Sequence, residues 1–250
     1  MFTDTHCHIT SEFYTNINEI VENARKNNIN KLIIDADDIE SCYEVIDIAS
    51  RFDNVFFTLG IHPEHVDEDV SKLKEIVENN KDNPKFVAIG EIGLDYYYTK
   101  DNKDKQLKLL EEEMILARKY NKPVIIHSRE ATKDTIDLLK KYPEVIGDIH
   151  CFSGSLETAR EYIKMGYYIG VGGVVTFKNA NIKDVIKELP LEKILLETDS
   201  PFLAPTPLRG TTNEPANVSL IADFLSDYLS IDKNELSRIT EENVHRLFNI

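Results

Sequence analysis

The chain carries the sequence FVAIGEI at residues 86–92, a short and almost continuous apolar run. A second run of this kind, VIIH, occupies residues 124–127. The segment 103–120 lies between them, and its apolar residues recur at helical spacing: Leu109, Leu110, Met114, Ala117 and Tyr120. Continuous apolar runs are typical of strands buried on both faces of a parallel sheet, and parallel neighbours need a crossover between them. These residues therefore predict one strand–helix–strand unit.

The same alternation extends in both directions along the chain. Eight short runs are predicted as strands: Phe2–Ile9, Lys31–Ala36, Val55–Ile61, Phe86–Ile92, Val124–His127, Val145–His150, Tyr167–Val171 and Ile194–Thr198. Amphipathic segments between them are predicted as helices: Ile17–Asn28, Glu40–Arg51, Val70–Asn80, Lys103–Tyr120, Thr132–Tyr142, Leu156–Met165 and Ile182–Leu189. This pattern predicts an α/β fold, a single (β/α)₈ TIM barrel that spans residues 1–250 as one domain. An open doubly wound sheet is the alternative, but no Gly-rich nucleotide fingerprint follows the first strand.

Composition limits the classes of function that fit. The chain has 250 residues, 42% of them hydrophobic, with 29 basic and 44 acidic residues and a net charge of −15. This acidity argues against a protein that coats nucleic acid or an anionic membrane, although it leaves room for a short strand end at a local site. No apolar run approaches the ~18–20 residues of a membrane helix. The start of the chain does not resemble a signal peptide, and only three cysteines are present; we therefore expect a cytoplasmic protein without an obligate protein partner.

Histidines and acids fall at the ends of the predicted strands. His6 and His8 end the first strand, Glu91 the fourth, His127 the fifth and His150 the sixth. The C-terminal ends of barrel strands meet around one opening, where such enzymes build their active sites. Residues two apart on a strand share a face, so His6 and His8 can both point into that opening. Imidazole nitrogen is a good ligand for divalent cations, and the combined pattern favours a metal site over a pair of ordinary buried histidines.

Two carboxylates complete the predicted set. A buried acid such as Glu91 is costly without a cation or hydrogen bonds, and its two oxygens allow it to bridge two metals. Asp199 follows the last strand and suits a metal ligand or the base for an attacking water, although it can also cap a turn. Asp95 is predicted either to orient a ligand or to cap the following loop, and Glu197 shares the inward face without an assigned role.

Three further residues are interpreted from their positions. His62 follows the third strand and is predicted to face the substrate, with a packing histidine as the alternative. Arg129 lies two residues beyond His127 and can hold a phosphate or carboxylate, with a surface ion pair equally compatible. Cys151 follows His150, so its side chain is expected to point away from the site and not to act as a nucleophile.

Seven short motifs, taken together, resemble the TatD family of metal-dependent hydrolases. They occur in order along essentially the whole chain: DTHCH at 4–8, GIHP at 60–63, GEIGLD at 90–95, PVIIHSR at 123–129, HCFSG at 150–154, ETDSP at 197–201, and RG at 209–210 with NEP at 213–215. The resemblance implies a TIM barrel of the amidohydrolase-like group. Many members carry a basic residue after the glycine of the last motif, where this chain has Thr211.

The resemblance also implies two divalent cations per subunit. One would be held by His6, His8, Glu91 and Asp199, and the other by Glu91, His127 and His150, with Glu91 bridging. The donor types do not distinguish zinc, manganese, magnesium, nickel or iron. Family members are described as deoxyribonucleases, so the resemblance implies hydrolysis of ester bonds.

We therefore expect a hydrolase that cleaves phosphodiesters with water activated by two metals, acting on a single-stranded DNA end or a small phosphoester. Glu91 and Asp199 are the expected catalytic residues, and His62 and Arg129 the expected substrate contacts. A second hypothesis is hydrolysis of a small cyclic amide, lactone or other ester, as in related barrels, many of which use a carboxylated lysine where this chain has Glu91. A third is a protein that binds metal or nucleic acid without catalysis.

Overall fold

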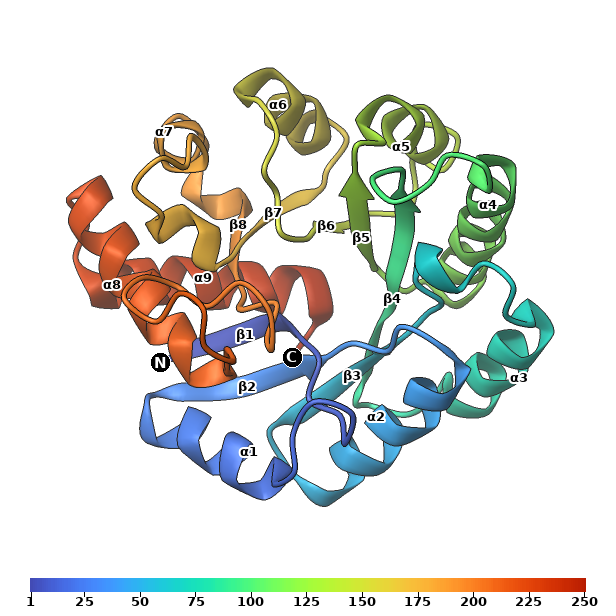
Figure 1. The fold of residues 1–250 in the computed structure, drawn as a ribbon, viewed down its shortest axis with the longest axis horizontal. Coiled ribbons are helices and arrows are strands. Elements are labelled where there is room, and N and C mark those ends of the chain that lie inside the picture. Colours follow the sequence, from blue (N-terminus) through green and yellow to red (C-terminus); the bar gives the residue numbers. More distant parts are fainter.

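A computed structural model describes residues 1–250. Eight parallel strands form one sheet whose order follows the sequence (Figure 1). They are β1 Phe2–Cys7, β2 Ile29–Ile34, β3 Val55–Leu59, β4 Phe86–Asp95, β5 Val124–Arg129, β6 Gly147–Ile149, β7 Tyr168–Val171 and β8 Ile194–Leu196. All eight predicted strands are present, with ends that differ by a few residues, and the (β/α)₈ TIM barrel is confirmed.

Nine α-helices surround the strands. They are α1 Ile17–Lys26, α2 Ile39–Arg51, α3 Val70–Asn80, α4 Lys103–Tyr120, α5 Thr132–Leu139, α6 Leu156–Lys164, α7 Ile182–Lys187, α8 Val218–Leu229 and α9 Lys233–Phe248. Four short 3₁₀ helices lie in the connections: η1 Pro63–His65, η2 Gly173–Thr176, η3 Leu191–Lys193 and η4 Pro215–Asn217. The seven predicted helices are all present, and α8 and α9 follow β8 in addition. None of the helices is both long and apolar enough to span a bilayer; the cytoplasmic location stays a prediction.

The barrel closes where β1 meets the chain that follows β8. Cys7 and Ser200 form a parallel bridge, and the His8 N–H donates to the Ser200 carbonyl at 2.7 Å. Before this bridge along both segments, the Asp4 carboxylate accepts hydrogen bonds from the backbone N–H of Thr198 at 2.9 Å and from the Thr198 hydroxyl. The first and last segments are thereby held side by side, so that His8 and Asp199 reach the same end of the barrel.

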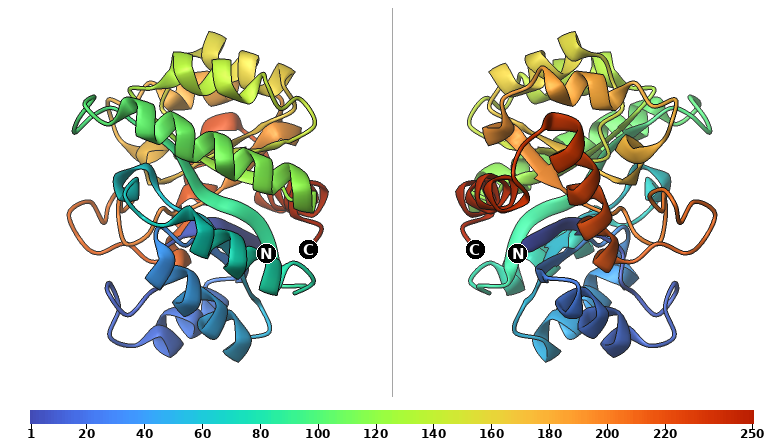
Figure 2. Two further views of the ribbon diagram at one scale, coloured as in Figure 1. Left: turned by 90° about the vertical axis from the view of Figure 1, so that its right-hand side faces the viewer. Right: turned by 90° about the vertical axis from the view of Figure 1, so that its left-hand side faces the viewer.

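The two ends of the barrel differ in polarity. Inward side chains near the strands' N-terminal ends form an apolar cluster with the last turns of α9, composed of Ile33, Val87, Ala88, Ile125, Tyr168, Leu195, Val244, Leu247 and Phe248. Helix α9 thus closes this end, which also carries both termini (Figure 2). The connections after the strands lie at the opposite end, where the polar site is built.

One buried acid supports a connection at that end. Glu113 of α4 is fully buried, and its Oε1 accepts a hydrogen bond from the Ile61 N–H at 2.8 Å, while Oε2 has no partner. Burial raises the pKa of this carboxyl well above its ordinary value of 4.5. The side chain is therefore neutral in the folded protein and holds the connection after β3, on which His62 lies.

Replacing this acid by its neutral analogue is expected to stabilise the protein in a pH-dependent way. A carboxyl whose pKa is raised by folding binds more protons in the native state than in the unfolded state. Its contribution to stability is therefore lost as the pH rises from its pKa in the unfolded chain, near 4.5, towards its higher pKa in the folded protein. The unfolding free energy of Glu113→Gln, relative to the native protein, should therefore increase between pH 4 and pH 7. Urea denaturation across this range measures it, with the exposed Glu75→Gln as control. A difference that does not change with pH would contradict the neutral state of Glu113.

Candidate metal centre

The predicted ligands line one cavity at the C-terminal end of the barrel. The cavity has a volume of about 800 Å³, and its lining includes His8, Glu91, His127, His150 and Asp199. His6 is fully buried directly beneath, with its ring stacked on that of His150 at a centroid distance of 4.0 Å. The structure therefore brings all six predicted ligands together from five different strands or strand ends.

A first group of donors surrounds one oxygen of Glu91. Oε2 of Glu91 lies 3.4 Å from His6 Nε2 and 3.3 Å from His8 Nε2. The two histidine nitrogens are 3.1 Å apart. Asp199 Oδ1 lies 3.7 and 3.8 Å from the same two nitrogens. Four donor atoms thus face a common point.

A second group surrounds the other oxygen of Glu91. Oε1 lies 2.9 Å from His127 Nδ1 and 2.8 Å from His150 Nε2. These two nitrogens are 3.1 Å apart. His62 Nε2 approaches the same oxygen at 3.6 Å. Glu91 thus contributes one carboxylate oxygen to each group.

These donors fit divalent cations. Four ligands at about 2.0–2.1 Å around a tetrahedral ion are separated by roughly 3.3 Å, which is close to the separations in both groups. Imidazole nitrogens with a few carboxylate oxygens suit zinc, manganese, nickel or iron. Three sets of three donors have all their ligand atoms within 4.8 Å of one another, and Glu91 belongs to two of them: His6, His8 and Glu91; His62, Glu91 and His127; and His6, His150 and Asp199. The number and identity of the metals stay a prediction.

Local backbone geometry aims these side chains. Gly93 has φ of +148°, and a Cβ there would lie 2.0 Å from the His127 carbonyl oxygen, so only glycine lets β4 approach β5 this closely. Asp199 and Cys151 adopt left-handed φ values of 53° and 45°. Such conformations are strained for non-glycine residues and cluster at functional sites. The alternation of side chains ends at these turns.

The predicted direction of Cys151 is wrong for this reason. Its side chain lines the cavity rather than pointing away. Burial raises the pKa of the thiol well above its ordinary value, and the nearby acids raise it further. The thiol is therefore protonated and a poor nucleophile, which agrees with the expected absence of a nucleophilic role.

The donors shift one another's pKa values. Burial alone would raise the pKa of Glu91, but the surrounding histidine rings lower it well below the ordinary range. Burial opposes protonation of His127, yet hydrogen bonds to Asp95 and Glu91 raise its pKa to about 9. Glu91 is therefore ionised, as a bridging ligand must be. A bound cation would take the place of the proton that the raised pKa keeps on His127.

A layer of acids supports the ligands from behind. Asp95 Oδ2 lies 3.1 Å from His127 Nε2, while Oδ1 accepts from the Tyr97 N–H at 2.8 Å. Asp95 thus caps the following turn and contacts His127, the residue predicted as a ligand. Glu197 accepts from the Cys151 N–H at 2.6 Å, which fixes the turn after His150.

Sequence reasoning missed two members of this layer. Asp35 lies 3.3 Å from His6 Nδ1, and Asp148 is fully buried beneath the site. Burial raises the pKa of Asp148 to about 7, and burial together with Asp148 raises that of Glu197 well above its ordinary range. The available signals were the acid at the end of the apolar run LIID at 32–35 and the two-residue spacing of Asp148 from His150.

The two predicted substrate residues lie at different depths. His62 lines the cavity, and its Nδ1 accepts from the Glu64 N–H at 3.2 Å, which leaves the proton on Nε2 facing Glu91. Burial lowers the pKa of His62 to about 3, so it is a neutral hydrogen-bond donor. Arg129 lies at the opening with its guanidinium 3.7 Å from the Tyr97 ring centroid. Its side chain is 43% exposed.

A parallel barrel with histidine and carboxylate donors at the strands' C-terminal ends is the architecture of a metal-dependent hydrolase. Comparison with known proteins agrees with this class. A family model described as TatD related DNase matches residues 3–249. The uncharacterized metal-dependent hydrolase YabD of Bacillus subtilis is 39% identical over 258 residues, covering all of both chains.

Solved structures show the same relationship. The TatD homologue YjjV of Escherichia coli superposes with a TM-score of 0.92 at 31% identity, covering 100% of this chain and 98% of that one. A TatD family hydrolase of Entamoeba histolytica gives 0.89 at 25% identity, covering 99% and 97%. The chain belongs to the TatD family of metal-dependent hydrolases.

The position of Asp95 yields a test of the metal centre. Outer residues that hold a ligating histidine typically contribute 10–100-fold to metal affinity. Asp95→Asn should therefore weaken binding of Mn²⁺ or Zn²⁺ by about that factor, measured by competition with a chromophoric chelator. Asp37→Asn is the control, because the Asp37 carboxylate lines the same cavity without a hydrogen bond to a histidine, and its only bond to one, from the His62 N–H at 2.8 Å, is accepted by the backbone carbonyl that the substitution keeps. Equal affinities in the two variants would show that Asp95 does not support the ligand.

Proposed function

We propose that this protein is a phosphodiesterase that hydrolyses the end of a short single-stranded DNA or a small phosphoester. The observation that carries the proposal is the arrangement of two donor groups around the two oxygens of Glu91, open to a cavity with one arginine at its mouth. His6, His8, Glu91 and Asp199 would hold one divalent cation, and Glu91, His127 and His150 a second. When bound, such cations polarise a phosphoryl oxygen and increase the acidity of water.

Asp199 suits the role of general base. Its side chain is 13% exposed, whereas that of Glu91 is 4% and that of His6 is fully buried. Asp199 is therefore the carboxylate of the ligand set that water can reach from the cavity. One of its oxygens faces His6 and His8, which leaves the carboxylate positioned to accept a proton from water that attacks a phosphorus atom above the site.

His62 and Arg129 suit the binding of the phosphate. The neutral His62 can donate from Nε2 to a phosphoryl oxygen without adding charge. Arg129 brings a planar fork of donors to the opening, and its position over the Tyr97 ring limits its freedom before substrate arrives. These two residues approach the metal centre from the sides of β3 and β5.

The remaining charge in the cavity favours a small or terminal substrate. Acids line it beyond the metal centre, including Glu12, Asp37, Asp38 and Glu64, and Arg129 is the one lysine or arginine in the lining. A long phosphate backbone laid across this opening would meet repulsion on most sides. A strand end or a compact ester brings few phosphates and avoids it.

Removing the base is expected to abolish turnover. Loss of a positioned general base costs about 10²–10⁴-fold in rate, so Asp199→Asn should lower kcat on oligothymidylate and on bis(p-nitrophenyl) phosphate by at least that much. Glu91→Ala, which removes the shared ligand, should leave no metal-dependent activity. Elemental analysis of each variant accompanies the kinetics, and Glu12→Gln serves as the control within the same cavity. Full activity in Asp199→Asn, or in a metal-free protein, would refute this mechanism.

Neutralising the arginine is expected to affect binding more than chemistry. A hydrogen bond to a charged group contributes about 1.5–3 kcal/mol, so Arg129→Gln should raise KM for a phosphodiester about tenfold or more with little change in kcat. Arg118→Gln removes a half-exposed arginine on the outside of the barrel and should leave both constants unchanged. If Arg129→Gln lowers only kcat, the arginine does not bind the ground-state phosphate.

A substrate panel separates this proposal from its alternatives. Lactones and dihydroorotate test the hydrolysis of cyclic esters and amides, and Glu91 stands where many of those enzymes use a carboxylated lysine. Cleavage of these compounds without cleavage of any phosphodiester would overturn the proposed substrate class. Binding of DNA without turnover, with every metal tested, would favour a non-catalytic protein.

A further inference from the structure

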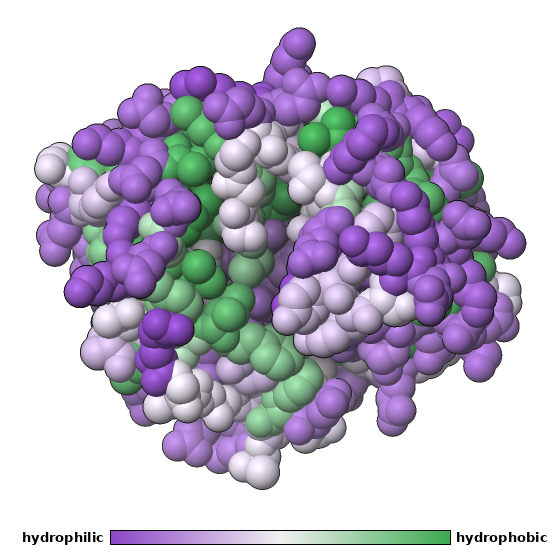
Figure 3. Space-filling model, turned by 45° about the horizontal axis from the view of Figure 1, so that its top comes forward, coloured by the Kyte–Doolittle hydropathy of each residue, from purple (hydrophilic) through white to green (hydrophobic).

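One side of the cavity is apolar, and the chemistry described above does not use it. Phe13, Val174, Phe202 and Leu203 line the cavity together with the ligand His8. Phe202 lies at the mouth of the cavity and is 49% exposed, which is unusual for a large apolar side chain. The space-filling view shows hydrophobic surface along one side of a hollow at this end of the molecule (Figure 3).

The backbone of Phe202 is held on both sides. Its N–H donates to the Asp199 carbonyl at 2.8 Å. The fully buried Asn213 donates from Nδ2 to the carbonyl of Phe202 at 2.7 Å and to that of Thr198 at 2.9 Å. The same amide therefore fixes the turn that carries Asp199 and the residue that presents the ring.

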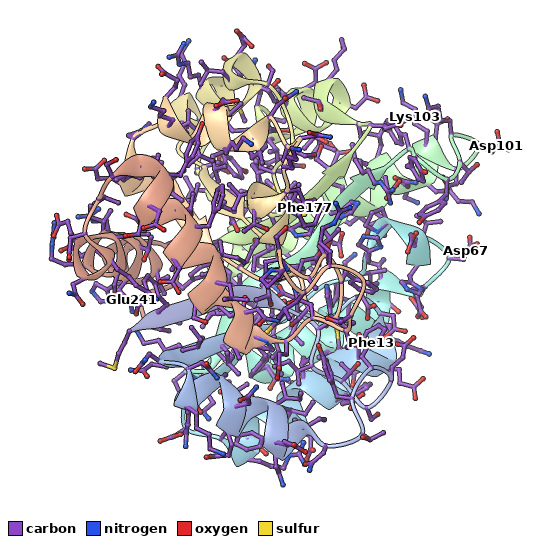
Figure 4. All side chains as sticks on the ribbon, turned by 60° about the vertical axis from the view of Figure 1, so that its left-hand side comes forward. Phe13, Asp67, Asp101, Lys103, Phe177 and Glu241 are labelled. Atoms are coloured by element: carbon purple, nitrogen blue, oxygen red, sulfur yellow. The ribbon has the colours of Figure 1, made fainter.

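The loop that carries Phe202, residues 197–214 between β8 and η4, also packs against η2 in the connection after β7. A Cβ at Gly173 would lie 2.2 Å from the Leu203 carbonyl oxygen, so the loop rests directly on the backbone of η2. Phe177, just beyond η2, lies beneath the Arg209 guanidinium at 4.1 Å from its ring centroid. Phe13 contacts this loop through Phe202, and Phe177 contacts it through Arg209. In Figure 4 the loop passes between the labelled Phe13 and Phe177.

The ring itself is oriented by aromatic contacts. Phe202 meets Phe13 edge to face at 5.6 Å and 76°, and meets the ring of His8 at 6.3 Å and 65°. An exposed phenyl ring held in this way loses little freedom when a flat group stacks on it. Its contact with His8 places that group beside the metal centre.

The charges that line the cavity determine which part of a substrate can bind at its apolar side. Asp37, Asp38 and Glu64 line the cavity from the connections that follow β2 and β3, next to the apolar side formed after β7, β8 and β1. A phosphate is drawn to the metal centre and Arg129, whereas an uncharged, flat and apolar group gains most at the phenyl ring. In a nucleic acid the parts with these properties are the bases, and stacking on aromatic side chains is the usual means of binding them without sequence preference.

We propose that Phe202 forms a stacking subsite for the nucleobase adjacent to the scissile phosphate, and that Asn213 positions it. This proposal rests on the proposed phosphodiesterase function, and it narrows the substrate class from phosphoesters to nucleotide esters. The subsite should favour substrates that carry a base over those that lack one by lowering KM rather than by raising kcat, because the stacked base is distant from the phosphoester bond that is cleaved.

The test compares two substrates that differ only in their bases. Tetrathymidylate and an abasic tetramer of the same sugar–phosphate backbone are hydrolysed by the metal-loaded enzyme, and products are followed by mass spectrometry. Stacking contributes about 5- to 150-fold in affinity per base, so the native enzyme should show a KM for tetrathymidylate lower by such a factor, with similar kcat. Phe202→Leu should remove this preference, and Phe202→Tyr should retain it.

Controls separate the subsite from a change in folding. Tyr43→Leu removes an exposed ring on α2 that does not line the cavity, and it should behave as the native enzyme. Hydrolysis of the abasic tetramer should be the same in Phe202→Leu and the native protein. Equal losses on both substrates, or no preference for bases in the native enzyme, would overturn the subsite while leaving the phosphodiesterase proposal intact.

A binding measurement separates failure of the phosphodiesterase proposal from failure of the stacking subsite. If the native enzyme cleaves neither tetramer with any metal, the proposed function fails. Fluorescence anisotropy of labelled tetrathymidylate with the Mn²⁺-loaded protein then tests the subsite by itself. Weaker binding by Phe202→Leu than by Phe202→Tyr supports it, and equal binding overturns it.

Discussion

The closure of the barrel between its first and last strands is the constraint on which the site depends. β8 ends at Leu196, and beyond it the seam is held by the Asp4 carboxylate, which bonds the backbone and hydroxyl of Thr198. Burial raises the pKa of Asp4 to about 7, and its hydrogen bonds to Thr198 oppose that shift. Because this seam places the chain after β8 beside β1, Asp199 reaches the two histidines that begin the site.

The division of the barrel into an apolar and a polar end explains why buried charge is tolerated here. Helix α9 fills one end with apolar side chains, so the polar groups gather at the other. Five buried acids lie in or directly beneath the ligand set, in addition to the partly exposed Asp199: Asp35, Glu91, Asp95, Asp148 and Glu197. Such a concentration of carboxyls is costly unless protons or cations offset it. The imidazoles partly do so, and a divalent cation would do so more fully.

Much of the fold and of the ligand set could be predicted because both follow from local periodicity. Continuous apolar runs identified the strands, and the two-residue spacing placed His6 and His8 on one face. Prediction failed where periodicity stops. Cys151 was assigned the wrong direction because its left-handed backbone ends the alternation of the strand. The roles of Asp35 and Asp148 were missed because their segments place an acid near a strand end but do not show that Asp35 lies against His6 or that Asp148 is buried beneath the site.

The sequence by itself determined the parallel barrel, the end at which its functional residues gather and the chemical types of the donors. These properties depend on short-range patterns of polarity and on the fixed geometry of strands. Only the tertiary structure decided that the two oxygens of Glu91 serve different groups, that Asp95 holds His127, and that Phe202 stands exposed on a fixed backbone. Such features depend on distances between segments far apart in the chain, which are set when the barrel closes and its loops pack.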